Sequence, residues 1–211
     1  MVDLKEKLEV ALTNNQKSEA VKIFQNALDE GTSIPYLYEK VLRDILNSIE
    51  CEDDDKACIW MEHQMTSITR TLLELSFPYI LKQKKTLSND KKVVIACPPK
   101  ETHELGAVMR ANMLTLCGFD TTYIGADTPN EVLFSAVEIL KPDYVVLSVT
   151  NFFHLFEVDQ AIQMIQESFP DVKILGGGRA FLKNYDHFKP LVDGIITDYA
   201  SIETYKKRQH L

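Results

Sequence analysis

One histidine, His103, lies in a loop between a predicted strand and a predicted helix, with a glutamate close by on each side. Glu101, two residues earlier, can accept the proton of one ring nitrogen, which leaves the other nitrogen as a neutral lone pair. This arrangement is usual for a histidine that ligates a metal. Gly106, three residues further on, lets a flat ligand approach the start of the helix closely. The alternative is a surface histidine that happens to follow a strand.

Two further loops carry small or hydroxyl-bearing residues. Ser148 and Thr150 close the third predicted strand, and their alternate positions place both hydroxyls on one face, where they could hydrogen-bond a polar ligand group. The alternative is that they only end a strand or cap a helix. Gly176-Gly177-Gly178 after the fourth strand would admit close passage of a ligand or a phosphate. The run is not GxGxxG, and Gly125-Ala126-Asp127-Thr128-Pro129 replaces the acidic end expected of the second strand, so a nicotinamide dinucleotide site is disfavoured.

All three loops follow strands of a predicted parallel sheet. From Val93 onward, runs of four or five apolar, mostly β-branched residues alternate with helical stretches of ten to fourteen residues, which is typical of βαβ units. The predicted strands are 93–97, 121–124, 144–148, 172–175 and 194–197, and the predicted helices are 105–117, 130–140 and 155–168, followed by a closing helix. Ligands of such sheets bind outside the carboxyl ends of the strands, where these loops begin.

The first 85 or so residues are predicted to be helical. Apolar residues recur at helical spacing in four segments, with Gly31 placed to end the second helix and Pro35 to open the third. Four amphipathic helices with short loops indicate a small bundle. The polar, Lys-rich segment 82–92 is the predicted linker, so the expected domains are 1–85 and 90–211.

Composition narrows the classes of function. The 211 residues carry a formal net charge of −8 at pH 7, which argues against non-specific nucleic-acid binding, because that depends on clustered Lys and Arg. No apolar run approaches the roughly 18 residues that span a bilayer, and the first residues lack the apolar core of a signal peptide. Four cysteines without a CxxC pair favour free thiols in a reducing cytoplasm and give little support to cysteine-based metal binding.

Taken together and in order, these motifs resemble those of the cobalamin-binding domain family. The family pattern is Asp-x-His-x-x-Gly, then Ser-x-Leu or Ser-x-Thr, then Gly-Gly, at the ends of three different strands. The sequence has Glu101-x-His103-x-x-Gly106, Ser148-x-Thr150 and Gly176-Gly177 at those places. The resemblance covers about residues 90 to 211, where it implies a Rossmann-like, flavodoxin-like domain with a parallel sheet of five strands. It continues into the helical part, which is similar to the family's four-helix cap.

The resemblance implies a binding site for cobalamin. His103 would replace the cofactor's own benzimidazole as the lower axial ligand of cobalt. The displaced nucleotide tail would then run between the strands, past Ser148, Thr150 and the glycines. In the cap, Glu62 and His63 would face the other side of the corrin ring, with His63 as a possible upper axial ligand. A polar helix face is the other interpretation of this pair.

Two departures from the family pattern affect these expectations. Glu101 is one methylene longer than the common Asp, which leaves open whether its contact with His103 is direct. Within the family, the loops are most similar to those of cobalamin-dependent photoreceptor regulators, which carry a Trp ten residues before Glu-His. Glu52 stands at that position, and the single tryptophan, Trp60, is expected to pack within the helices. This departure bears on light sensing and not on corrin binding.

The resemblance favours a free-standing cobalamin-binding protein without a DNA-binding domain. The first hypothesis is a cobalamin- or light-responsive sensor that acts through a protein partner or through self-association, with adenosylcobalamin favoured over methylcobalamin. The alternative is a corrinoid methyl-carrier subunit of a methyltransferase system. Neither role makes the chain an enzyme on its own. A third possibility is a degenerate domain that has lost the cofactor. Direct contact with nucleic acid or a membrane is not expected.

Overall fold

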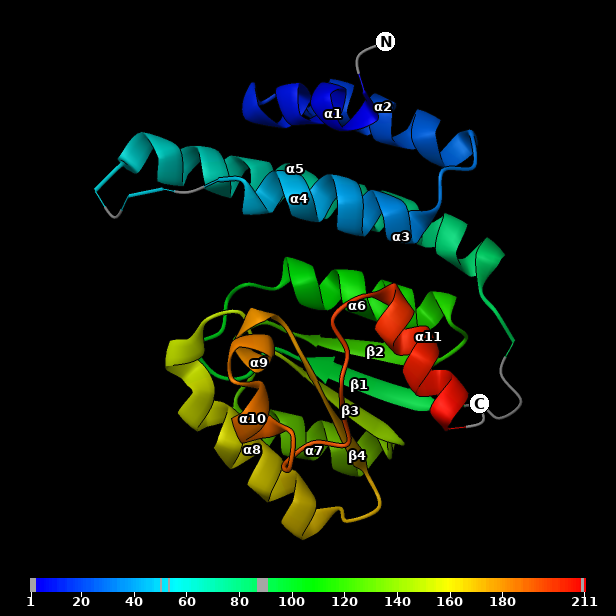
Figure 1. Cartoon of the computed structure of the whole chain (residues 1–211), viewed down its shortest axis with the longest axis vertical. Helices are drawn as coiled ribbons and strands as arrows, with labels where there is room; N and C mark the ends of the chain where they lie inside the picture. Colours follow the sequence, from blue (N-terminus) through cyan, green and yellow to red (C-terminus); the bar gives the residue numbers. More distant parts are fainter. Residues whose placement is uncertain (1–2, 50, 53, 87–90, 210) are drawn as a thin grey trace. The chain divides into compact units, whose positions relative to one another are not determined.

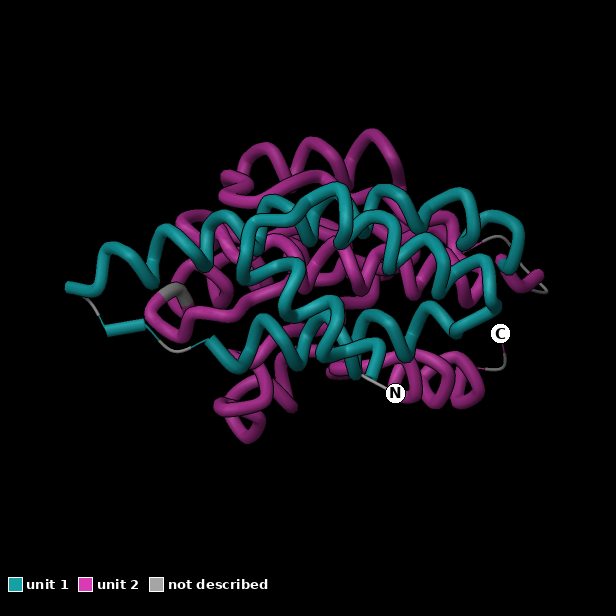
Figure 2. Tube along the Cα trace, turned by 90° about the horizontal axis from the view of Figure 1, so that it is seen from above, with its two compact units in different colours: residues 1–83 teal, residues 84–211 magenta. Residues whose placement is uncertain are grey.

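The chain divides into two compact units, Met1–Gln83 and Lys84–Leu211, coloured separately in Figure 2. The computed structural model describes residues 3–49, 51–52, 54–86, 91–209 and 211. Residues 87–90 of the predicted linker lie outside that range.

The first unit consists of helices, as the apolar spacing predicts. Its elements are α1 (Leu4–Thr13), α2 (Lys17–Asp29), α3 (Ile34–Tyr36), the π-helical η1 (Leu37–Leu42), α4 (Arg43–Asn47) and α5 (Lys56–Gln83). The third predicted helix corresponds to α3, η1 and α4, which follow one another without a break. Pro35 lies in the first turn of α3, where its missing N–H costs no hydrogen bond. The apolar stripes of α1, α2, η1 and α5 form the core of this unit (Leu8, Leu12, Phe24, Leu37, Val41, Met65, Leu72).

Two expectations about this unit are wrong. Cys51 and Cys58 form a disulfide, while Cys97 and Cys117 in the second unit are buried thiols, so the argument for a reducing compartment loses its basis. Trp60 is 62% exposed and does not pack in the core. It lies five residues before the buried Met65, which at 3.6 residues per turn is about 140° away around α5.

The second unit is built on a parallel sheet. Its strands are β1 (Lys92–Ala96), β2 (Asp120–Gly125), β3 (Tyr144–Ser148), β4 (Lys173–Gly177) and β5 (Gly194–Ile195), and among the residues described they pair in the order β2-β1-β3-β4-β5. This is the flavodoxin-like order, as predicted. Every residue of β3 is buried, and so are four of the five residues of β1 and of β4, because helices cover both faces.

Helices cover both faces of the sheet in Figure 1, with α6 (Leu105–Leu116) and α11 (Tyr199–Arg208) on one face and α7 (Asn130–Leu140) and α8 (Leu155–Ser168) on the other. The short elements are η2 (Phe152–His154), α9 (Arg179–Lys183) and α10 (Tyr185–Phe188). The strand order makes β1 and β3 neighbours, although β2 lies between them in sequence. The loops after β1 and β3 therefore begin side by side. Among the described helices, none has the length and apolar character required to cross a membrane.

Candidate functional site

The loop after β1 is fastened to the loop after β2. Lys100 and Asp127 both have left-handed backbones, with φ of 69° and 47°. The Lys100 N–H donates to Asp127 Oδ1 at 2.7 Å, and the Asp127 N–H donates to the carbonyl of Glu101 at 2.9 Å. The Thr128 N–H also donates to the carbonyl of Cys97 at 2.9 Å. These bonds fix the backbone that leads to His103.

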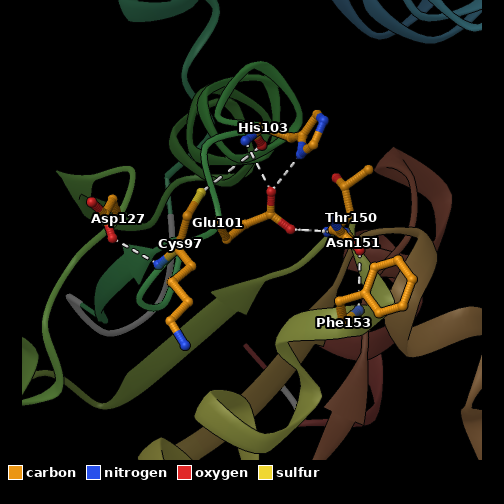
Figure 3. Close-up of polar contacts among 8 residues, drawn as sticks. Cys97, Glu101, His103, Asp127, Thr150, Asn151 and Phe153 are labelled. Atoms are coloured by element: carbon orange, nitrogen blue, oxygen red, sulfur yellow. Dashed lines mark hydrogen bonds and ion pairs between the residues drawn. The ribbon is translucent and has the colours of Figure 1, made fainter. Parts of the chain in front are cut away.

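Glu101 joins this loop to the loop after β3. Its side chain is 0% exposed. Oε1 accepts hydrogen bonds from the Nδ1 of His103 at 2.6 Å and from the His103 N–H at 2.9 Å. Oε2 accepts from the N–H groups of Thr150 at 2.7 Å and Asn151 at 2.8 Å (Figure 3). The contact with His103 is therefore direct, and one buried carboxylate holds both loops.

Glu101 is ionised. Burial by itself would raise its pKa, but the hydrogen bonds from the His103 ring and from the backbone N–H groups of Asn151, His103 and Thr150 outweigh burial and lower the pKa to about 2. Because an ionised carboxylate only accepts hydrogen bonds, the proton between the two side chains belongs to Nδ1 of His103.

Acid is expected to weaken the second unit through Glu101. Its pKa of 4.5 in the unfolded chain falls to about 2 in the folded protein, so the native hydrogen bonds contribute about 3 kcal/mol above pH 5. This contribution is lost as the pH falls from about 5 to about 2. We would measure urea unfolding of the wild type and Glu101→Gln between pH 7 and pH 2.5. Other carboxylates titrate in both proteins, so the difference in unfolding free energy should shrink on acidification. A constant difference would contradict the assignment.

His103 presents the geometry of a metal ligand. Its side chain is 55% exposed, and Nδ1 is turned toward Glu101, so Nε2 points away from the carboxylate. With the proton on Nδ1, Nε2 carries the neutral lone pair that metals bind. A Cβ added to Gly106 would meet nothing within 4 Å, so the start of α6 is open to a flat ligand.

Two other side chains near His103 could in principle bind a metal, Glu104 and Cys97, but neither is in a suitable state. Glu104, the second glutamate near His103, accepts a hydrogen bond from the Tyr123 hydroxyl at 2.9 Å. Burial, together with the nearby Glu101 carboxylate, raises the pKa of the Cys97 thiol to about 12. Cys97 is therefore a protonated thiol at neutral pH, and thiolate is the form that binds metals.

The glycines after β4 accommodate the chain's own side chains. A Cβ on Gly176 would lie 2.3 Å from the Phe181 ring, and one on Gly177 would lie 2.6 Å from the Arg110 guanidinium. Gly178 has a φ of +98°, and its Cβ would lie 2.1 Å from the carbonyl oxygen of Val149. In this structure, Phe181 and Arg110 occupy the space that the missing side chains of Gly176 and Gly177 leave.

Ser148 and Thr150 differ in their surroundings. Ser148 is 2% exposed, and its hydroxyl accepts a hydrogen bond from Nη1 of Arg110 at 3.0 Å. Thr150 is partly buried and contacts Glu101 through its backbone. Sequence reasoning missed Arg110. The signal was present, since it is the single charged residue in the otherwise apolar or small α6 sequence.

The predicted site residues of the cap lie in the other unit. Glu62 and His63 are on α5, and both are exposed. Their place opposite the corrin ring stays a prediction. The other predicted site residues are all in the second unit, in the loops after β1, β3 and β4. They are Glu101, His103, Ser148, Thr150 and the glycines.

Comparison with known sequences identifies the second unit. Residues 91–201 match the family model of the B12 binding domain. A curated relative, the HTH-type transcriptional repressor CarH of Myxococcus xanthus, is 26% identical over 134 residues, which cover 63% of this chain. The matched part spans 43% of that relative's length.

Solved structures resemble the chain over nearly its whole length. The monomethylamine corrinoid protein of Methanosarcina barkeri has a TM-score of 0.77 at 17% identity, with 98% of each chain covered. A cobalamin-binding protein from Desulfitobacterium hafniense DCB-2 has a TM-score of 0.52 at 14% identity, again over 98% of each chain. The methanol:cobalamin methyltransferase complex MtaBC of Methanosarcina barkeri matches with a TM-score of 0.52 at 17% identity, over 98% of this chain and 79% of that one. At these identities the likeness shows a shared fold.

Proposed function

Because the chain belongs to the B12 binding domain family, whose model covers residues 91–201, we propose that it carries a corrinoid with His103 as the lower axial ligand of cobalt. The observation that carries this proposal is the 2.6 Å hydrogen bond between His103 Nδ1 and the buried Glu101. This hydrogen bond occupies Nδ1, so Nε2 faces outward with a lone pair that can bind a metal. A single imidazole suits a metal whose equatorial ligands come with it, as they do in a corrin ring. When bound, the corrinoid supplies a cobalt centre that can hold and release an alkyl group.

The protein contributes orientation and proton control. Glu101 fixes the tilt of the imidazole and keeps the proton on Nδ1, so that Nε2 is the atom presented to a ligand. The same carboxylate holds the backbone at Thr150 and Asn151, which ties the position of His103 to the rim of the site formed by the loop after β3.

For the chain as a whole we propose the role of a methyl carrier, in which the corrinoid is presented to a partner methyltransferase. The support is the likeness to the monomethylamine corrinoid protein over 98% of both chains. In the sequence, glutamates flank His103 where methyl carriers usually have Asp-x-His-Asp, which favours a sensor over a carrier. That distinction loses force because Glu104 accepts a hydrogen bond from the Tyr123 hydroxyl, and Nδ1 of the histidine ring donates its hydrogen bond to Glu101.

A cobalamin- or light-responsive sensor is the second candidate. The observation that favours it is the 26% identity to the repressor CarH over 134 residues. In this role adenosylcobalamin would be the bound form, and self-association or a protein partner would transmit the change of state.

The histidine ligand and the role of the chain can each be tested on the purified protein. We would load protein labelled with ¹⁵N in its histidines with cobalt(II) cobalamin and record the EPR spectrum. The label should change the nitrogen hyperfine pattern, because a histidine ligates the cobalt. An unchanged pattern would exclude His103 as the ligand.

To separate carrier from sensor, protein loaded in the dark with methylcobalamin or adenosylcobalamin would be run on a sizing column before and after green light. A carrier should elute unchanged in both cases. A light-dependent elution volume would reject the carrier role in favour of the sensor.

A further inference from the structure

An arginine side chain occupies the interior of the proposed corrinoid domain. Arg110 lies in the middle of α6 and is 7% exposed. Its Nη1 donates to Ser148 Oγ at 3.0 Å and to the carbonyl of Gly106 at 3.2 Å, and its Nε donates to the carbonyl of Ile196 at 3.2 Å. The guanidinium thus bridges three places: the end of β3, the start of α6 and the segment after β5.

The guanidinium also lies against the end of β4. Ser148 and Gly177 are register partners on neighbouring strands. A Cβ on Gly177 would come within 2.6 Å of the Arg110 side chain, so the missing side chain is what makes room for it. These are two of the residues expected to line the path of the nucleotide tail. The base at the end of that tail would therefore meet Arg110.

The chemistry of the guanidinium sets which base it tolerates. Arginine is charged at any relevant pH and can only donate hydrogen bonds. A dimethylbenzimidazole base that entered this space would press methyl groups against a buried charge and displace it from its acceptors, which is unfavourable. Both bases are flat, but dimethylbenzimidazole offers a single acceptor nitrogen, whereas a purine offers several along its edges and carries no methyl groups.

We propose that Arg110 determines the specificity for the lower base of the corrinoid and selects a tail that ends in a purine over one that ends in dimethylbenzimidazole. This inference rests on the proposed function, since it requires that a corrinoid binds with its tail in the second unit. It concerns the nucleotide end and not the cobalt, so it can fail while His103 ligation stands.

The test compares three corrinoids by spectral titration: cobalamin, its analogue with adenine as the lower base, and cobinamide, which has no base. Wild-type protein should bind the adenine analogue ~10-fold more tightly than cobalamin, the factor of one well-placed base contact. In Arg110→Met this preference should disappear or invert. Cobinamide affinity should change less than about 2-fold in the variant, since no base reaches the slot.

Arg179→Met is the matched control, because Arg179 is an exposed arginine just after β4. It should retain the wild-type preference. Arg110→Gln is a second variant that keeps a donor of smaller size, and thermal unfolding of each variant checks its fold. Equal affinity of the wild type for cobalamin and the adenine analogue would overturn the inference, as would a preference that survives in Arg110→Met or Arg110→Gln. Failure of all three corrinoids to bind would reject the proposed function itself, and the inference with it.

Discussion

Replacing Glu101 with alanine is expected to destabilise the protein by about 3 kcal/mol and to weaken corrinoid binding by about 10- to 100-fold. The variant removes one carboxylate that accepts hydrogen bonds from three backbone N–H groups and one imidazole. Each buried donor left without an acceptor costs about 1–3 kcal/mol, and water that enters the partly buried loops recovers some of this loss. The histidine would also lose the partner that fixes its ring and its tautomer.

The measurements for Glu101→Ala are urea unfolding at pH 7 and titration with cobalamin. Glu104→Gln is the matched control, because Glu104 is the glutamate on the other side of His103 and its hydrogen bond comes from the Tyr123 hydroxyl. We expect Glu104→Gln to change the unfolding free energy by less than about 1.5 kcal/mol, which is typical of a single hydrogen bond. Similar losses in both variants would show that Glu101 has no special position in the site.

Replacing His103 with alanine is expected to abolish the spectrum of histidine-ligated cobalamin and to weaken binding by about 100-fold or more, or roughly 2.7 kcal/mol. The loss should be specific to the ligand. The His103 side chain is 55% exposed, so its removal leaves little cavity. Unfolding in the absence of corrinoid should therefore change much less than in Glu101→Ala. Visible spectra during titration, with urea unfolding of the unloaded variant, measure both quantities.

His187→Ala is the control for this variant. His187 belongs to the same unit, its side chain is 51% exposed, and its Nε2 contacts Asp159 at 3.0 Å, so it is also a half-exposed histidine beside a carboxylate. Its replacement should leave the spectrum and the affinity unchanged. His63→Ala tests the upper axial ligand that the family resemblance implies in the cap. That change should alter only the spectrum of cobalamin without an alkyl group. A normal histidine-ligated spectrum in His103→Ala would end the assignment of the lower ligand.

The sequence by itself determined most of the elements and the place of the candidate site in the fold. Short β-branched runs separated by helical stretches led to the parallel sheet, and β3, α7 and α8 begin and end where they were predicted. The carboxyl ends of parallel strands lie at one edge, so the motifs around His103, Ser148 and Gly177 were expected near one another. These inferences succeed because helical and strand periodicity and the spacing within one loop are local properties of the chain.

Only the tertiary structure decided which side chains meet. Glu101 accepts hydrogen bonds from backbone groups 49 and 50 residues away, and these contacts exist only once β1 and β3 are neighbours in the sheet. Arg110 fills the space beside Gly177, although the glycine run alone suggested an open passage. Such contacts cannot be predicted from local sequence patterns, because they join segments that are far apart in the chain. Which segments meet is decided by the packing of the whole unit.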